Sequence, residues 1–305
     1  MYDIIGDIHG HADQLGRLLD MLGYRAKAGV YQHSESKAVF LGDLIDRGPQ
    51  IPQVLDIVRR MVDSGHALAV MGNHELNALA YHTQDAQGEY LRPHNEKNVR
   101  QHRATVEQLD GVLLQEYLKW FRSLPLWLEL DGLRAVHACW DNESMTTIRG
   151  AHSLSDGISD EFLISACRKT GALYKQVEIV LKGKEIPLPD GTVFCDKNGT
   201  ERREIRTRWY LRPDGHTYCS YALQAEKIDC DKTIDEAAAA SASPYSPDEK
   251  PVFVGHYWLS AQRPEVLAEN VACLDFSVAK GGLLCAYRWQ GERKLSNDHF
   301  VWVSG

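Results

Sequence analysis

Asp7 and His9, in the N-terminal stretch MYDIIGDIHG, are the first residues whose types and spacing could bind a metal ion. They follow a short apolar run, and side chains two positions apart on a strand point to the same face. Both would then extend past the end of a sheet, where a metal ion could sit between them. A purely structural pair is the alternative that these two residues leave open.

Four further motifs carry residues of the same chemical kind. A single histidine at a strand end is more often a hydrogen-bonded structural residue than a ligand. Together, however, the motifs supply imidazole, carboxylate and amide groups, a mixture that suits Zn, Fe or Mn better than Mg or Ca. The motifs are GDLIDRG (Asp43, Asp46, Arg47), GNHE (Asn73, His74, Glu75), VHA (His137) and VGH (His256).

The elements that must position these residues alternate between short apolar runs and segments of helical period, which predicts β-α-β units and an α/β fold. In such sheets ligands gather beyond the carboxyl ends of the strands, so we expect the polar motifs to converge. Strands are predicted at 2–6, 38–42 and 67–72, each followed by a helix, at 11–23, 51–65 and 73–82. Further along, 94–123 reads as helical, 124–140 as a hairpin turning at Asp131-Gly132, and 252–258 and 271–303 as strands.

Composition describes an ordinary globular protein of 305 residues, with 44% apolar and 25% charged residues. A formal net charge of -8 disfavours bulk binding to nucleic acid or to an anionic membrane. Seven scattered cysteines without a Cys-x-x-Cys motif predict reduced thiols. With no leader-like segment and no apolar stretch of membrane-spanning length, we expect a cytoplasmic protein and no membrane partner. The oligomeric state is open.

Residues 150–250 are expected to form a cap-like insertion in a single domain that spans 1–305. A helix is predicted near 160–170, a hairpin over 186–215, and an exposed loop over 235–251. On the candidate strand ERREIRTRWY, alternation places Arg202, Glu204, Arg206 and Arg208 on one face. Arg206 and Arg208 are candidate phosphate ligands, and a charged exposed face is the alternative.

The order GD-x-HG, GD-x-x-DRG, GNHE and two separate histidines resembles the calcineurin-like metallophosphoesterases of the phosphoprotein phosphatase type. The resemblance implies a four-layer α/β/β/α sandwich with two mixed β-sheets. It also implies two transition-metal ions, Mn, Fe or Zn, bridged by Asp43. The implied ligands are Asp7, His9 and Asp43 for one ion, and Asp43, Asn73, His137 and His256 for the other.

The same resemblance implies a mechanism. A hydroxide bridging the two ions would attack the phosphorus, while Arg47 and Asn73 contact the phosphate. His74 would protonate the leaving oxygen, held by Asp46. For Glu75 we expect only a favourable interaction with the helix dipole. Asp3 and His11 are expected to be solvated or capping residues, outside the site.

The sequence departs from the phosphoprotein phosphatase pattern at two places that bear on the substrate. Val254 stands where phosphoprotein phosphatases carry an arginine, and Ala138-Cys139 stands in place of Gly-Gly. VHACW, GHYW and CLDFSVAKGG instead resemble the bacterial symmetrical dinucleoside tetraphosphatases, although that branch tends to have Ala at the position of Asp46. Trp209, Tyr257 and Trp258 could stack on a base or an aryl group, or pack in the core.

The leading interpretation is a two-metal phosphoester hydrolase acting on phosphomonoesters, with a phosphoprotein serine/threonine phosphatase as one form of it. The alternative is a hydrolase of dinucleoside polyphosphates or of nucleic-acid ends. A non-catalytic adaptor is a third hypothesis, which the complete ligand set disfavours. The expected partner is a phosphorylated small molecule, a nucleotide or a phosphoprotein.

Overall fold

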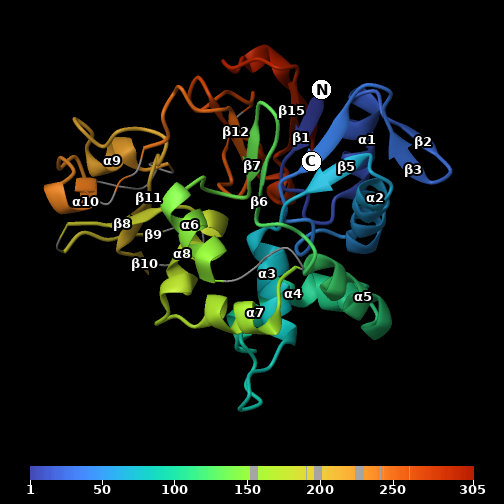
Figure 1. Ribbon diagram of the computed structural model, residues 1–305, viewed down its shortest axis with the longest axis horizontal. Coiled ribbons are helices and arrows are strands. Elements are labelled where there is room, and N and C mark those ends of the chain that lie inside the picture. Colours follow the sequence, from blue (N-terminus) through green and yellow to red (C-terminus); the bar gives the residue numbers. More distant parts are fainter. Residues whose placement is uncertain are drawn as a thin grey trace.

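Two mixed β-sheets form the centre of the structure, a computed structural model that describes residues 1–151, 157–189, 191–195, 201–223, 230–240, 242, 244–260 and 262–305 (Figure 1). The first sheet has the order β14 (Asp275–Phe276), β15 (Leu283–Trp289), β1 (Tyr2–Ile5), β4 (Lys37–Phe40) and β5 (Ala67–Ala69), with β16 (Phe300–Ser304) paired to β15. The second has the order β13 (Val271–Cys273), β12 (Val252–Val254), β7 (Arg134–Val136) and β6 (Trp127–Glu129). Strands β1, β4 and β5 run parallel in the first sheet, and β7, β12 and β13 in the second.

Alternation along the strands divides the buried side chains between two cores. Ile4 and Val39 belong to an apolar cluster with Phe253 and Tyr287, which joins the two sheets, and the Phe253 and Tyr287 rings lie 5.1 Å apart. The neighbouring residues Ile5 and Phe40 belong to a second cluster that includes helix side chains. The sheets therefore pack face to face, as sandwich sheets do.

Helices cover the outer faces. Helix α1 (Ala12–Met21) and helix α2 (Ile51–Asp63) pack on the first sheet. Helices α6 (Asn142–Ala151) and α8 (Ala172–Lys182) lie beside the second sheet, where Val180 shares an apolar cluster with Val136 and Val254 (Figure 1). The predicted four-layer α/β/β/α architecture is confirmed.

The segment predicted as helical over 94–123 forms α4 (Glu96–Gln108) and α5 (Gly111–Phe121). They are separate because Asp110 caps α5, accepting a hydrogen bond from the Leu113 amide at 2.8 Å. Helix α3 (Asn73–His82) precedes them and follows β5 directly. The predicted hairpin is also confirmed, with β6 and β7 joined through Gly132 at φ 88°.

The insertion has a small apolar cluster of its own, which includes Ile186, Ile205, Tyr218 and Tyr221. Its predicted hairpin consists of two short ladders, whereas we expected one continuous strand, and its Asn-Gly turn lies outside the described residues. The helix predicted near 160–170 is α7. The elements are α7 (Asp160–Cys167), β8 (Glu185–Pro187), β9 (Phe194–Cys195), β10 (Glu201–Arg202), β11 (Glu204–Arg206), α9 (Tyr218–Tyr221) and α10 (Glu236–Ala240).

Three expectations were wrong or incomplete. The loop expected over 235–251 contains α10, because its alanines favour helix and Asp235 caps it, accepting from the Ala238 amide at 2.8 Å. Asp3 is fully buried rather than solvated, and it accepts a hydrogen bond from Arg288 Nε at 2.7 Å. A hairpin of β2 (Arg25–Lys27) and β3 (Val30–Gln32), and two 3₁₀ turns, η1 (Val278–Lys280) and η2 (Asn297–His299), were not anticipated.

No helix in the described part of the chain is both long enough and apolar enough to cross a membrane.

Candidate metal centre

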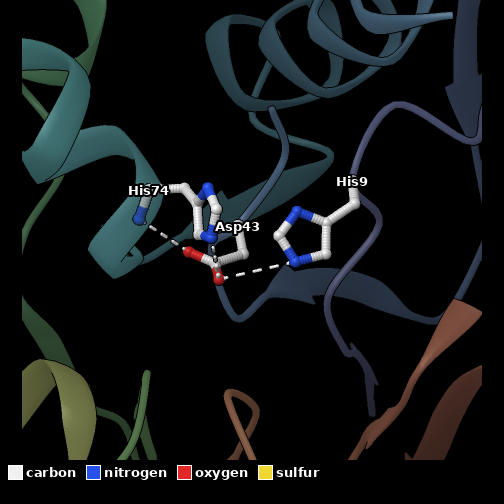
Figure 2. A group of neighbouring side chains, drawn as sticks. All are labelled: His9, Asp43 and His74. Carbon is white, nitrogen blue, oxygen red and sulfur yellow. Dashed lines mark hydrogen bonds and ion pairs between the residues drawn. The ribbon is translucent and has the colours of Figure 1, made fainter. Parts of the chain in front are cut away.

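The carboxyl ends of β1, β4 and β5 bring the first three motifs together, because these strands are parallel and adjacent. The second sheet faces them and adds His137 after β7 and His256 after β12. His9, Asp43 and His74 come from three segments well separated in sequence, and Figure 2 shows Asp43 between the two histidine rings. The predicted convergence of the motifs is therefore confirmed.

The first group consists of His9, Asp43 and His74, whose candidate ligand atoms all lie within 4.8 Å of one another. Asp43 Oδ2 is 3.6 Å from His9 Nε2 and 3.9 Å from His74 Nε2 (Figure 2). His9 donates its Nδ1 proton to the Ile45 carbonyl at 2.8 Å, so Nε2 carries the lone pair. This second hydrogen bond is typical of histidine that ligates a metal.

The second group consists of Asp43, His137 and His256, with Asn73 beside them. His137 donates its Nδ1 proton to the Leu41 carbonyl at 2.6 Å. Its Nε2 is therefore turned toward Asp43 Oδ1 at 3.4 Å and Asn73 Oδ1 at 3.1 Å. Asn73 Oδ1 is also 2.7 Å from His256 Nδ1. Asp43 is common to both groups, as a bridging ligand would be.

Asp7 lies beside the two groups and faces the His256 backbone. Its carboxylate accepts hydrogen bonds from the His256 backbone amide at 3.1 and 3.2 Å, and it does not belong to either group of three. Burial, together with the Asp275 and Asp43 carboxylates, raises the pKa of Asp7 well above its ordinary value.

The donor set fits transition-metal ions. The Nε2 atoms of His9 and His256 are buried and have no hydrogen-bond partner, an arrangement that costs free energy unless a ligand is bound. Burial lowers the pKa of His9 to about 3, and burial followed by the Arg206 charge lowers that of His256 well below its usual value. Both rings are therefore neutral, the form that binds metals. Mixed imidazole, carboxylate and amide oxygen ligands suit Zn, Mn or Fe.

A second feature, an Asp-His pair, adjoins the first group. Asp46 Oδ2 accepts the Nδ1 proton of His74 at 2.5 Å. Asp46 Oδ1 accepts from His102 Nδ1 at 2.8 Å and from the Thr105 hydroxyl at 2.5 Å. Although burial opposes it, these hydrogen bonds from His102 and His74 hold the pKa of Asp46 well below its ordinary value. Asp46 is therefore a carboxylate that fixes the orientation of the His74 ring.

His102 and Thr105 were missed at the level of sequence, although a signal was present. Three polar residues of the predicted helix have the spacing i, i+1 and i+4, which places them on one side of it. They are Gln101, His102 and Thr105 of α4. Asp275 was also missed. It follows β13 in the manner in which Asp7 follows β1, and it accepts from the Trp258 amide at 2.7 Å.

Backbone strain is concentrated at these motifs. Five non-glycine residues of the site have left-handed φ values: His9 at 46°, Asp43 at 50°, Asp46 at 67°, Arg47 at 69° and His256 at 69°. Such conformations cost about 1–3 kcal/mol each and persist where the surrounding structure imposes them. The strands and their partners therefore hold these side chains in place against local preference.

Glu75 is much more than a residue that favours the helix dipole. Its buried carboxylate accepts hydrogen bonds from the amides of Asp43 at 2.9 Å, Leu44 at 2.8 Å and Gly72 at 3.0 Å. It thus joins the second motif to the third. Three backbone donors at one carboxylate would be left unsatisfied if that carboxylate were lost.

The glycines of the motifs allow backbone segments to lie close to one another. A Cβ on Gly72 would lie 2.3 Å from both N and Oδ1 of Asp43, and one on Gly42 would lie 2.3 Å from the Gly72 nitrogen. A Cβ on Gly6 would lie 2.1 Å from the Leu274 carbonyl oxygen. These glycines therefore allow contact between neighbouring loops.

The three arginines expected to bind the substrate phosphate have different surroundings in the structure. Arg47 is exposed and lies 4.0 Å above the Trp258 ring. Arg206 forms an ion pair with Glu185 at 3.4 Å, and its charge reaches His256. Arg208 instead donates to the Ala222 carbonyl at 3.2 Å.

On the other face of the candidate strand, Ile205, Thr207 and Trp209 are buried as alternation predicts, whereas Arg203 is exposed. The strand itself, β11, ends at Arg206. Trp209 and Tyr257 are core residues, and Trp209 donates to the Tyr257 hydroxyl at 3.1 Å. His11, as expected, lies outside both groups, and its Nδ1 donates to the Ile8 carbonyl at 3.0 Å.

Comparison with known families and proteins agrees with this geometry. The model of the family described as calcineurin-like phosphoesterase matches residues 2–156, which is half of the chain. The cold-active protein-tyrosine phosphatase of a psychrophilic Shewanella species matches with a TM-score of 0.50 and 19% identity, over 94% of this chain and 75% of that one. That likeness shows a shared fold.

Among curated proteins, an asymmetrical bis(5'-nucleosyl)-tetraphosphatase of Oceanobacillus iheyensis is 33% identical over 138 residues, 45% of this chain and 54% of that protein. A symmetrical bis(5'-nucleosyl)-tetraphosphatase of Vibrio campbellii is 25% identical over 308 residues, 97% of each chain. The chain thus spans about half the length of the first curated relatives it matches, and nearly all of the Vibrio protein.

Replacing Glu75 tests whether its carboxylate joins the two loops. Glu75→Gln is expected to lower the free energy of unfolding by about 1–3 kcal/mol, because an amide cannot accept from three backbone donors as a carboxylate does. Urea denaturation measures this. The matched control Glu107→Gln removes the same charge from an exposed side chain and should cost less than about 0.5 kcal/mol. Equal effects of the two variants would contradict the role of Glu75.

Proposed function

Because this chain belongs to the calcineurin-like phosphoesterase family, we propose that it is a two-metal hydrolase whose metal ions share Asp43 and whose His74 acts as general acid. The observation that carries this proposal is the pair of ligand groups with Asp43 in common, beside the Asp46 and His74 pair. Two buried imidazole nitrogens without a hydrogen-bond partner, on His9 and His256, further support bound metal ions.

The residues that would hold one ion are Asp7, His9 and Asp43, which leaves His74 Nε2 free for proton transfer. Asp43, Asn73, His137 and His256 would hold the other. When bound, the two ions supply activation of water and neutralisation of the phosphoryl oxygens. Mn, Fe and Zn all suit these ligands.

The chain's own residues supply positioning and proton transfer. Asp46 holds the His74 ring through Nδ1, which leaves Nε2 to give a proton to the leaving oxygen. Arg47, braced on the Trp258 ring, offers a planar fork for two phosphate oxygens. Arg206 is the better second phosphate ligand, since Arg208 is held by a backbone carbonyl.

The leading substrate class is a phosphomonoester, and a phosphoprotein is one form of it. A dinucleoside polyphosphate is the second candidate, favoured by the tetraphosphatase of Vibrio campbellii that matches almost the whole chain. The ligands for the metal ions would be the same in both cases. The two classes differ in the leaving group, which is an alcohol or phenol in the first and a phosphate chain in the second.

A single domain of residues 1–305, with an insertion over about 150–250 that caps the site, agrees with the separate apolar cluster of the insertion. The seven cysteines are free thiols, which supports a reducing compartment such as the cytoplasm.

Metal reconstitution tests the proposed reaction. Protein stripped of metal and supplied separately with Mn²⁺, Zn²⁺, Fe²⁺ or Mg²⁺ is expected to regain hydrolysis with at least one of the first three. Phosphate or nucleotide release is measured from 4-nitrophenyl phosphate, a phosphoserine peptide and a dinucleoside tetraphosphate. Asp43→Asn should stay inactive with every metal, since both ligand groups lose their shared carboxylate. No turnover by folded, metal-loaded wild-type protein, or full activity of Asp43→Asn, would refute the hydrolase.

The role of His74 has a signature in the leaving group. His74→Asn is expected to lower kcat by about 10²–10⁴ for an alkyl phosphomonoester, whose leaving alkoxide needs a proton. The loss should be far smaller for 4-nitrophenyl phosphate, because nitrophenolate leaves without one. His66→Asn, at the opposite end of β5 from the site, is the control. Equal losses for both substrates would show that His74 is not the general acid.

A further inference from the structure

Arg92 is a cation beside the catalytic groups that no expectation included. It lies in the segment between α3 and α4, and its backbone amide donates to the Ala80 carbonyl at 3.0 Å. Its guanidinium donates to Asn77 Oδ1 at 2.7 Å and to Gln101 Oε1 at 2.8 Å. Asn77 lies on α3, one turn after His74, and Gln101 lies on α4, next to His102. Arg92 therefore joins the two helices that carry the general acid and its support.

The charge of Arg92 is not neutralised by its contacts. Both acceptors are uncharged amide oxygens, and the Asp46 and Glu178 carboxylates, which act on its charge, form no ion pair with it among the residues that the structure describes. The side chain is only partly exposed, and burial lowers its pKa from the ordinary arginine value. A partly buried, unpaired cation is costly in free energy unless an anion binds it.

Arg92 also fixes the orientation of the Gln101 amide. A guanidinium has donors only, so the oxygen of the amide must face Arg92 and its NH₂ group must face the other way. That NH₂ group lies 3.4 Å from His74 Nε2, the atom that gives up the proton. When His74 is protonated on Nε2, two donors stand side by side and neither can accept from the other. A third atom, an acceptor oxygen of the substrate, satisfies both.

We propose that Gln101 and Arg92 form the leaving-group subsite of this centre, and that the leaving group they accept is anionic, a phosphate chain that continues beyond the phosphorus under attack. The proposal rests on the proposed function and names its substrate class. A neutral alcohol would satisfy the amide of Gln101, but it would leave the charge of Arg92 unpaired. A nucleoside diphosphate leaving group satisfies both.

The reaction step is then balanced as follows. A bond forms from the oxygen of the attacking water to the phosphorus, and this water releases one proton to solvent. The bond between that phosphorus and the bridging oxygen, which links it to the next phosphate, breaks, and its electron pair stays on the bridging oxygen. His74 gives its Nε2 proton to the bridging oxygen, and the Gln101 amide donates a hydrogen bond to the same oxygen. Arg92 neutralises the charge on the next phosphate of the chain.

Kinetics with two leaving groups test the proposal in the metal-loaded full-length protein. Arg92→Ala and Gln101→Ala are each expected to lower kcat/KM for a dinucleoside tetraphosphate by about 10-fold or more, the effect of losing a hydrogen bond to a charged group. For 4-nitrophenyl phosphate, whose leaving group carries no further phosphate, the change should stay under about 3-fold. The matched control is Arg100→Ala, an exposed arginine of the same helix, which should change neither value. Equal losses for the two substrates, or no loss for either, would overturn the proposal.

Binding of adenosine diphosphate, measured by calorimetry, gives a readout that does not need turnover. Wild-type protein is expected to bind it, and Arg92→Ala to bind it about 10-fold or more weakly. Should the wild type hydrolyse no phosphoester, the proposed function fails while this measurement still decides the subsite. Unchanged affinity in Arg92→Ala would overturn the subsite even in an active hydrolase. Gln101→Ala, at a helical position where alanine is favourable, keeps the test valid if Arg92→Ala does not fold.

Discussion

The shared carboxylate of Asp43 is the interaction on which the rest of the site depends. One side chain faces His9 and His74 through Oδ2 and His137 through Oδ1, so its position sets the separation of two ligand groups. The Asp43 backbone is left-handed, at φ 50°, and its amide is held by Glu75. Its Oδ1 also accepts from the His74 amide at 2.9 Å, which binds it to the start of α3. The carboxylate is thus fixed from both ends before any metal ion is bound.

The sandwich explains how such a position can be held. Parallel strands β1, β4 and β5 deliver three loops to one edge, and β7 and β12 of the facing sheet deliver two histidines to the same place. The apolar cluster between the sheets fixes the distance between those edges. The strands that carry these strained loops are largely buried, so packing within the sheets offsets the strain. Helix α4 supports the site as well, because its His102 and Thr105 side chains donate hydrogen bonds to the Asp46 carboxylate.

Sequence reasoning recovered what depends on local pattern. Short apolar runs placed the central strands, and segments of helical period placed α1 to α3 and the helical stretch that contains α4 and α5. The rule that polar groups gather at strand ends identified every residue of the two ligand groups. What it could not recover depends on contacts between distant segments. Three such contacts have no local signature in the sequence. They are the hydrogen bonds from three backbone amides to Glu75, the burial of Asp3 against Arg288, and the hydrogen bond from the His256 amide to Asp7. Arg92 and Gln101 were missed for the same reason, since only the packing of α3 against α4 brings them to His74.

The number of metal ions bound per chain tests the central claim most directly. Metal-stripped wild-type protein and the Asp43→Asn variant are equilibrated with Zn²⁺ or Mn²⁺, freed of excess ions and analysed for metal content. The shared carboxylate predicts about two ions per wild-type chain and fewer than about one in Asp43→Asn, while Asp20→Asn, an exposed carboxylate, retains both ions. A wild-type chain that binds a single ion, or an Asp43→Asn variant that still binds two, would contradict it.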